Sequence, residues 1–169
     1  MRVLIKNALA SSEAQETITI KGWVRTRRDN KAFSFLEMND GSCLASMQCI
    51  ADVGIPGSED LAKMSTGAAV AITGKLVPSQ GKGQQWEIHA TSVELIGTSP
   101  EDYPLQKKRH SPEFLRNISH LRPRANLYGA VFRMRSRLAR AVHRFFEEKD
   151  FTYVPVSYTH LTLPTICSV

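Results

Sequence analysis

The stretch that decides the fold covers residues 22–40. It reads Gly22-Trp23-Val24-Arg25-Thr26-Arg27-Arg28-Asp29-Asn30, then Lys31-Ala32-Phe33-Ser34-Phe35-Leu36-Glu37-Met38-Asn39-Asp40. A basic segment runs directly into an aromatic one, and a hairpin would bring the two together. Lys and Arg side chains neutralise phosphates, and aromatic faces stack on unpaired bases. The stretch therefore indicates a surface for single-stranded nucleic acid.

The basic segment belongs to an alternating pattern that begins before it. Residues 17–25 place three apolar side chains on one face, Ile18, Ile20 and Val24. This period of two predicts a strand with one buried face. Gly22 interrupts the pattern, and a glycine inside a strand often marks a bend or bulge. The alternation therefore leaves the facing of residues 26–28 open.

The aromatic segment alternates as well, over residues 32–39. Leu36 and Met38 share one face, and Phe33 and Phe35 share the other with polar neighbours. If Leu36 and Met38 are core, two phenylalanines lie on the polar side, where base stacking would explain them. The alternative is an inverted register with both phenylalanines in the core.

The next predicted strand, residues 43–50, favours the first register. One face carries small apolar side chains suited to a core, Cys43, Ala45, Met47 and Cys49. Gln48 then faces outward, where it could lie beside Phe35 and offer a donor and an acceptor to a base edge. Cys43 and Cys49 become buried core thiols rather than ligands.

Three more elements follow. Residues 58–64 predict a short helix with Ser58 as its N-cap. Residues 69–77 and 85–96 predict strands, the second with Trp86, Ile88 and Ala90 inward and Glu87 and His89 opposite. Three strands, a short helix and two strands match the five-stranded OB barrel, which binds oligonucleotides. The expected fold is therefore mainly β.

The rest of the chain differs in composition. Residues 97–112 predict a Pro- and Gly-punctuated connector whose Lys107-Lys108-Arg109 cluster contacts a phosphate backbone or is simply solvated. Residues 126–149 predict a helix capped by Asn126. Its apolar stripe can dock on a core or a partner subunit, and its arginine stripe is read as solvated. These two stripes hold Leu127, Val131, Met134, Leu138 and Phe145, and Arg133, Arg137, Arg140 and Arg144.

Charge and composition limit the class of protein. Residues 1–100 carry ten Lys/Arg and ten Asp/Glu, so the net +6 lies in residues 101–169. That imbalance suggests a polyanion partner or a solvated surface. No apolar run approaches the roughly 18–20 residues that cross a bilayer, and the N-terminus is too polar for a signal peptide. Cys43, Cys49 and Cys167 form no metal spacing. We expect a cytoplasmic protein with no membrane partner.

Three motifs resemble asparaginyl-tRNA synthetase, in the class II subgroup that it shares with the aspartyl and lysyl enzymes. The similarity covers about residues 1–156. The motifs are residues 22–29 (Gly-Trp-Val-Arg-Thr-Arg-Arg-Asp), residues 35–42 (Phe-Leu-Glu-Met-Asn-Asp-Gly-Ser), and residues 108–116 (Lys-Arg-His-Ser-Pro-Glu-Phe-Leu-Arg) with residues 120–124 (His-Leu-Arg-Pro-Arg). The last motif favours the asparaginyl over the other two enzymes.

The resemblance implies an N-terminal OB domain that reads the anticodon of tRNA(Asn). Phe35 resembles the aromatic residue that stacks on the central uridine, and Gln48 resembles the glutamine that hydrogen-bonds it. Arg28 and Glu87 resemble residues at or near the first anticodon base. Arg25 and Phe33 complete the expected anticodon-binding set. An OB module that binds single strands without reading sequence, or an aspartyl-type fragment, is the alternative.

The resemblance also implies a homodimeric ligase that uses ATP and Mg²⁺ to join asparagine to tRNA. We expect residues 1–100 to be the OB domain, residues 101–125 a hinge, and residues 126–156 the start of the catalytic domain with motif 1. Motifs 2 and 3 are missing, so we expect a truncated chain without ligase activity and without catalytic residues. Residues 157–169, including His160 and Cys167, resemble an unrelated, artefactual tail.

Overall fold

The computed structural model describes residues 2–81 and 83–155. The expectations for Val156 and for the tail at residues 157–169 lie outside the described residues. The chain divides into two compact units, Met1–Ala130 and Val131–Val169.

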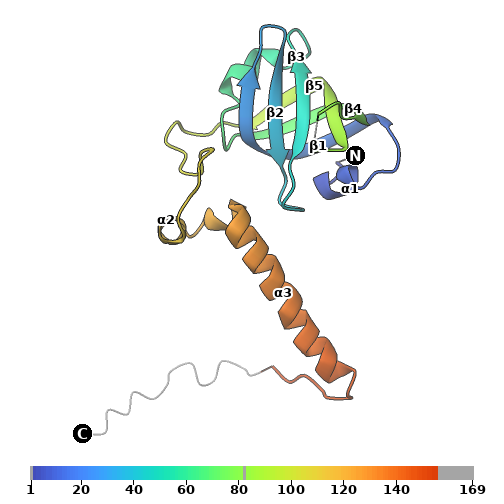
Figure 1. The fold of residues 1–169 in the computed structure, drawn as a ribbon, viewed down its shortest axis with the longest axis vertical. Coiled ribbons are helices and arrows are strands. Elements are labelled where there is room, and N and C mark those ends of the chain that lie inside the picture. Colours follow the sequence, from blue (N-terminus) through green and yellow to red (C-terminus); the bar gives the residue numbers. More distant parts are fainter. Residues whose placement is uncertain (1, 82, 156–169) are drawn as a thin grey trace, which may run out of the picture. The chain divides into compact units, whose positions relative to one another are not determined.

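Five strands of the first unit close into a barrel (Figure 1). They are β1 (Gln15–Asp29), β2 (Phe33–Asn39), β3 (Met47–Asp52), β4 (Ala69–Pro78) and β5 (Trp86–Gly97). Their order around the barrel is β1-β2-β3-β5-β4, and β3 and β5 are parallel whereas the other neighbours are antiparallel. A short helix, η1 (Ser58–Lys63), joins β3 to β4. The predicted order of three strands, helix and two strands is confirmed.

The inward faces are those that the alternation predicts. The buried core includes Ile18, Ile20, Val24, Leu36, Met38, Met47, Cys49, Val70, Ile72, Leu76, Trp86, Ile88 and Ala90. Phe33 and Phe35 are half-buried on the other face of β2. The register with Leu36 and Met38 in the core is therefore confirmed, and the inverted register with both phenylalanines in the core is wrong.

Sequence reasoning missed one element of the core. Helix α1 (Ile5–Leu9) buries Ile5 and Ala8 against the barrel. The Val3 amide donates to the Thr19 carbonyl at 2.8 Å, which ties the segment before α1 to β1. Five residues are too few for a helical period to stand out, since isolated short helices are marginal without tertiary packing.

The start of β3 was predicted wrongly. It begins at Met47, not at residue 43, so Ala45 is exposed and Cys43 is only half-buried. The Asn39 amide donates to the carbonyls of Cys43 and Ala45, at 3.2 and 2.7 Å, and holds this segment as a loop. Cys49 is a buried core residue as predicted, whereas Cys43 is not buried.

Two local expectations about glycine and capping also need correction. Gly57, with φ of 82°, precedes η1 as its N-cap, whereas Ser58 Oγ accepts from the Gly54 amide at 3.2 Å. Gly22 lets β1 lie close to the end of β2, because a Cβ at this position would lie 2.7 Å from the Asn39 carbonyl oxygen. The irregularity in the β1–β2 register lies between Val24 and Thr26, which makes Arg25 the bulged residue.

Three helices follow the barrel: α2 (Pro112–Asn117), η2 (Arg122–Arg124) and α3 (Asn126–Glu147). Ser111 caps α2 by accepting from the Phe114 amide at 3.2 Å, and Leu115 is buried. The predicted long helix is confirmed to within two residues. None of the helices in the described part of the chain has the length and apolar character of a membrane span.

Candidate nucleic-acid interface

Two rows of side chains cross four strands on the outer face of the barrel. Direct pairing of β1 with β2, β2 with β3 and β3 with β5 aligns them. The first row is Arg28, Phe35, Ile50 and His89. The second row is Thr26, Glu37, Gln48 and Glu87. Side chains of directly paired residues share a face, so each row forms a continuous strip.

The first row is built around the ring of Phe35. The Arg28 guanidinium carbon lies 5.8 Å from the ring centre. Phe33 meets the same ring edge-on, at 5.0 Å between centres and 85° between planes. The facing of Arg28, which the alternation left open, is thus on the side of Phe35. A half-exposed aromatic ring with a cation beside it can accept a stacked base and contact its phosphate.

The second row supplies polar groups. Thr26 Oγ1 donates to Glu37 Oε2 at 3.0 Å, which fixes that carboxylate. The side-chain amide of Gln48, between Glu37 and Glu87, makes no hydrogen bond to the described residues. It is half-buried and diagonal to Phe35. Its donor and its acceptor are both available to the edge of a base beside that ring.

Glu87 lies on the predicted face but is covered. It is only 6% exposed, and its carboxylate accepts from Ser79 Oγ at 2.8 Å. Its other oxygen is 3.2 Å from His89 Nε2. Ser79 Oγ also accepts from the Gly81 amide and from Gln84 Nε2, so the β4–β5 loop is anchored over Glu87. A ligand meets the loop and His89 before it meets this carboxylate.

Arg25 points elsewhere. Its guanidinium donates to the Arg124 carbonyl and to Asn126 Oδ1, each at 2.6 Å. The bulge in β1 turns this side chain to the segment that follows the barrel. Asn126 is the first residue of α3, and the oxygen expected to cap that helix is held by Arg25. Among the six predicted residues, Arg28, Phe33, Phe35 and Gln48 therefore lie together on one outer face of the barrel. Glu87 lies on the same face beneath the β4–β5 loop, and Arg25 lies apart.

Ile50 and His89 belong to the first row although sequence reasoning did not select them. The signal was available, because Ile50 has the same strand parity as Gln48, and His89 the same parity as Glu87. What the sequence could not supply was the parallel pairing of β3 with β5, which aligns Ile50 with His89.

Two observations concern metal ligands and thiols in the described residues. Within residues 2–81 and 83–155, no three His, Cys, Asp or Glu side chains gather as a metal site. Burial raises the pKa of the Cys49 thiol, which therefore stays protonated inside the barrel.

Known proteins resemble this chain in sequence and in fold. Residues 18–96 match the family described as an OB-fold nucleic acid binding domain of the tRNA anticodon type. The asparagine–tRNA ligase of Nitratidesulfovibrio vulgaris strain DP4 is 58% identical over 154 residues, which are 90% of this chain and 33% of the relative. That of Geobacter metallireducens is 54% identical over 153 residues, again 90% and 33%.

A solved structure shows the same fold. Asparaginyl-tRNA synthetase from Pyrococcus horikoshii, complexed with asparaginyl-adenylate, superposes with a TM-score of 0.77 at 19% identity, over 92% of this chain and 37% of that one. The chain spans about a third of the length of the curated relatives it matches, 33% for the first two. The barrel has the OB fold of the family that residues 18–96 match, and the chain is homologous to the asparaginyl-tRNA synthetases over about a third of their length.

Proposed function

We propose that the barrel binds the anticodon loop of tRNA(Asn). The observation that carries this proposal is the half-exposed ring of Phe35, with Arg28 on one side of it and Phe33 packed edge-on against it. Phe35 stacks on the central uridine of the anticodon, and the uncommitted Gln48 amide bonds to the edge of that base. Arg28 contacts the first anticodon base or its phosphate.

The remaining predicted residues act less directly in this proposal. Phe33 supports Phe35 through their edge-on contact. Glu87 contacts RNA through its partners Ser79 and His89, which cover it. Arg25 holds the segment after the barrel, through its bonds to residues 124 and 126.

We further propose that the whole protein joins asparagine to tRNA(Asn) with ATP, releasing AMP and pyrophosphate, as a cytoplasmic homodimer that uses Mg²⁺. The names of the relatives and of the adenylate complex support the ATP-dependent reaction. Residues 1–100 are the anticodon domain in this proposal, residues 101–125 a hinge, and residues 126–156 the start of the catalytic domain. The 169-residue chain alone is expected to show no asparagine-dependent pyrophosphate exchange. If adding asparagine raised the exchange rate above the rate measured without asparagine, this expectation would be wrong.

Binding of a fluorescent asparagine anticodon stem-loop tests the central proposal. Base stacking contributes roughly 1–3 kcal/mol per base, so Phe35→Ala should weaken binding about tenfold or more. Phe151→Ala removes an equally apolar ring, 65% exposed and outside the barrel, and should leave binding unchanged. Equal binding by wild type and Phe35→Ala, with both folded by thermal melting, would refute the role of Phe35.

Stem-loops with different anticodon sequences distinguish anticodon reading from general binding of single strands. Wild type should prefer the asparagine loop over a scrambled loop and over the aspartate anticodon at fixed salt. Gln48→Leu should reduce the preference for uridine over cytidine at the central position, because it removes the amide that reads the base edge. Equal affinity for all loops, with a steep salt dependence, would identify the general module instead.

A further inference from the structure

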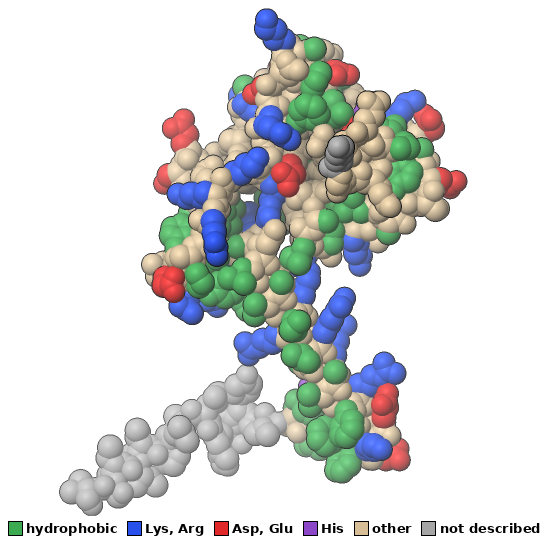
Figure 2. Space-filling view, in the orientation of Figure 1, with side chains coloured by type: hydrophobic (Ala, Val, Ile, Leu, Met, Phe, Trp, Pro, Cys, Tyr) green, Lys and Arg blue, Asp and Glu red, His purple; other side chains and the backbone are tan. Residues whose placement is uncertain are grey.

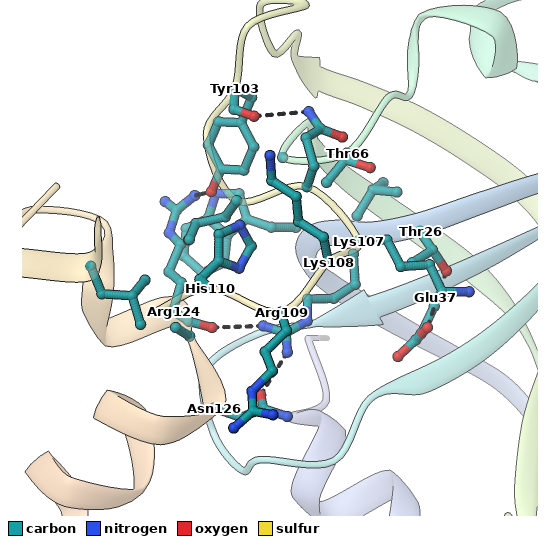
Figure 3. A pocket seen from close by; sticks show the side chains of 18 of the residues that line it. Thr26, Glu37, Thr66, Tyr103, Lys107, Lys108, Arg109, His110, Arg124 and Asn126 are labelled. Carbon is teal, nitrogen blue, oxygen red and sulfur yellow. Dashed lines mark hydrogen bonds between the residues drawn. The ribbon is translucent and has the colours of Figure 1, made fainter. Parts of the chain in front are cut away.

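A second candidate site lies apart from the Phe35 row. A pocket of about 530 Å³ opens between strands β1 and β2 and the segment of residues 103–127 (Figure 3). All of its lining residues belong to the first compact unit. Trp23, Thr26 and Glu37 line the barrel side.

The lining is strongly cationic. Five of its side chains carry a positive charge: Arg25, Lys107, Lys108, Arg109 and Arg124. Glu37 is the carboxylate among the lining residues, and it accepts a hydrogen bond from Thr26. Figure 3 shows Lys107, Lys108 and Arg109 with Arg124 around the pocket, and in Figure 2 Lys and Arg side chains surround a hollow on this part of the surface.

This charge is not neutralised within the described chain. None of the five cations forms a salt bridge with a described carboxylate. Arg25 instead donates to a carbonyl and an amide oxygen, and Arg124 donates to Tyr103 Oη at 3.2 Å. Neutral acceptors orient a guanidinium but leave its charge in place. An anion entering the pocket would therefore meet several uncompensated cations.

Part of the lining is also held in position. The Arg124 guanidinium carbon lies 4.1 Å from the centre of the Trp23 ring, a stacking contact that fixes the side chain. The Arg25 guanidinium is held by two bonds to residues 124 and 126. Because these groups are ordered before a ligand arrives, binding costs less side-chain entropy.

We propose that this pocket binds phosphate groups, independently of base stacking on Phe35. The phosphates come either from an RNA backbone or from a free polyphosphate. The first source agrees with the place of the pocket, since Thr26 and Glu37 line it and also belong to the second row of the outer face. A strand lying on that face would pass its backbone close to the pocket.

The fluorescence of Trp23 can report ligand binding in this pocket. It lies in the pocket and is 36% exposed, whereas Trp86 is buried in the core and bonded to the Ser11 carbonyl. Titration of the full chain with sodium tripolyphosphate, at constant ionic strength, should change tryptophan emission in a saturable way. Trp23→Phe should abolish this change.

A triple variant, Lys107→Ala with Lys108→Ala and Arg109→Ala, tests the site. All three side chains are exposed, so the fold should persist. Losing three cations should weaken tripolyphosphate binding about tenfold or more, because each charge-assisted contact is lost. The matched control removes three exposed cations that do not line the pocket, Lys6→Ala, Lys21→Ala and Lys149→Ala, and should leave affinity within about twofold.

The same variants, titrated with the asparagine anticodon stem-loop, distinguish the sources. Weaker binding of both probes by the pocket variant supports an RNA backbone, and loss of tripolyphosphate alone supports a free polyphosphate. A non-saturable response, no loss in the pocket variant, or an equal loss in the control overturns the proposal. The outcome is separable from the Phe35 test, since Phe35→Ala should leave tripolyphosphate binding intact.

Discussion

Arg28 and Phe35 face each other across β1 and β2, with the guanidinium carbon 5.8 Å from the centre of the ring. The bulge at Arg25 makes this pairing possible. Without the extra residue, the alternation of β1 would turn Arg28 to the opposite face. A one-residue irregularity thus places a cation beside the ring proposed to stack on a base.

Replacing Arg28 with glutamine should weaken binding of the anticodon stem-loop. The cation is exposed and near the ring, so its loss removes a phosphate contact. The slope of log affinity against log salt should fall by about 0.7–0.9, the value for one phosphate contact. Lys21→Gln removes an exposed cation from the same strand and should leave the slope unchanged. An unchanged slope in Arg28→Gln would mean that this side chain contacts no phosphate.

Ser79→Ala should destabilise the barrel. The hydroxyl donates to the nearly buried Glu87 and accepts from two groups of the β4–β5 loop. Leaving a buried carboxylate oxygen without this donor costs roughly 1–3 kcal/mol. Urea unfolding followed by far-UV circular dichroism measures the loss. Ser12→Ala, at an exposed position, should change the free energy of unfolding by less than about 0.5 kcal/mol; equal stability of both variants would contradict the proposed anchoring.

Gly74→Ala should also destabilise the barrel, for a steric reason. A Cβ there would lie 2.1 Å from the His89 carbonyl oxygen, beside the register shift of β4 and β5. Forcing the strands apart costs about 1–3 kcal/mol or more. Gly97→Ala is the control, since a Cβ at that position meets no atom within 4 Å. Thermal melting should lower the midpoint for Gly74→Ala alone, and equal midpoints would show that the strands adjust freely.

Most of the barrel could be predicted because strand parity survives in the sequence. Leu36 and Phe35 differ by one position and lie on opposite faces, and that difference was enough to choose the register of β2. The start of β3 could not be predicted in this way. Cys43 and Ala45 keep the correct parity, but the Asn39 side chain binds their carbonyls and holds them out of the strand.

The candidate site was predictable only where one strand determines it. Phe35 and Gln48 follow from parity, whereas the facing of Arg28 depends on a bulge that the sequence does not reveal. The covering of Glu87 depends on Ser79, eight residues away across a loop. The cationic pocket depends on Arg25 reaching residues 124 and 126, about a hundred residues further on. Such long-range contacts have no local sequence signal.

The apolar stripe of α3 should mediate association. Met134, Leu138 and Val142 are exposed, with Leu138 at 61%. Exposed apolar stripes of this kind favour docking on a partner surface. Sedimentation velocity of wild type should show a larger species as concentration rises, and Leu138→Glu should remove it. Arg137→Glu changes charge beside the stripe and keeps it apolar, so it should retain association. A concentration-independent monomer in wild type would exclude self-association through the stripe.

Asp40 should make stability depend on acid pH. Its carboxylate is 1% exposed and accepts from the Ile5 amide and from the amide and hydroxyl of Ser42. Burial alone would raise the pKa of Asp40, but the hydrogen bonds and the charge of Arg2 outweigh it, so its pKa lies below the ordinary value of 3.8. A lowered pKa stabilises the folded state above the unfolded pKa, and this stabilisation is lost as pH falls through the folded pKa.

Asp40→Asn removes that titration. Wild type should therefore lose free energy of unfolding as pH falls below about 4, and the variant should lose less over the same range. Above pH 5 the variant should be less stable by roughly 1–2 kcal/mol, because a neutral amide is a weaker acceptor for the amides of Ile5 and Ser42. Asp102→Asn, at an exposed position, should follow the wild-type curve. Parallel curves for wild type and Asp40→Asn, from urea unfolding at pH 3 to 6, would show that other carboxyls carry the acid sensitivity.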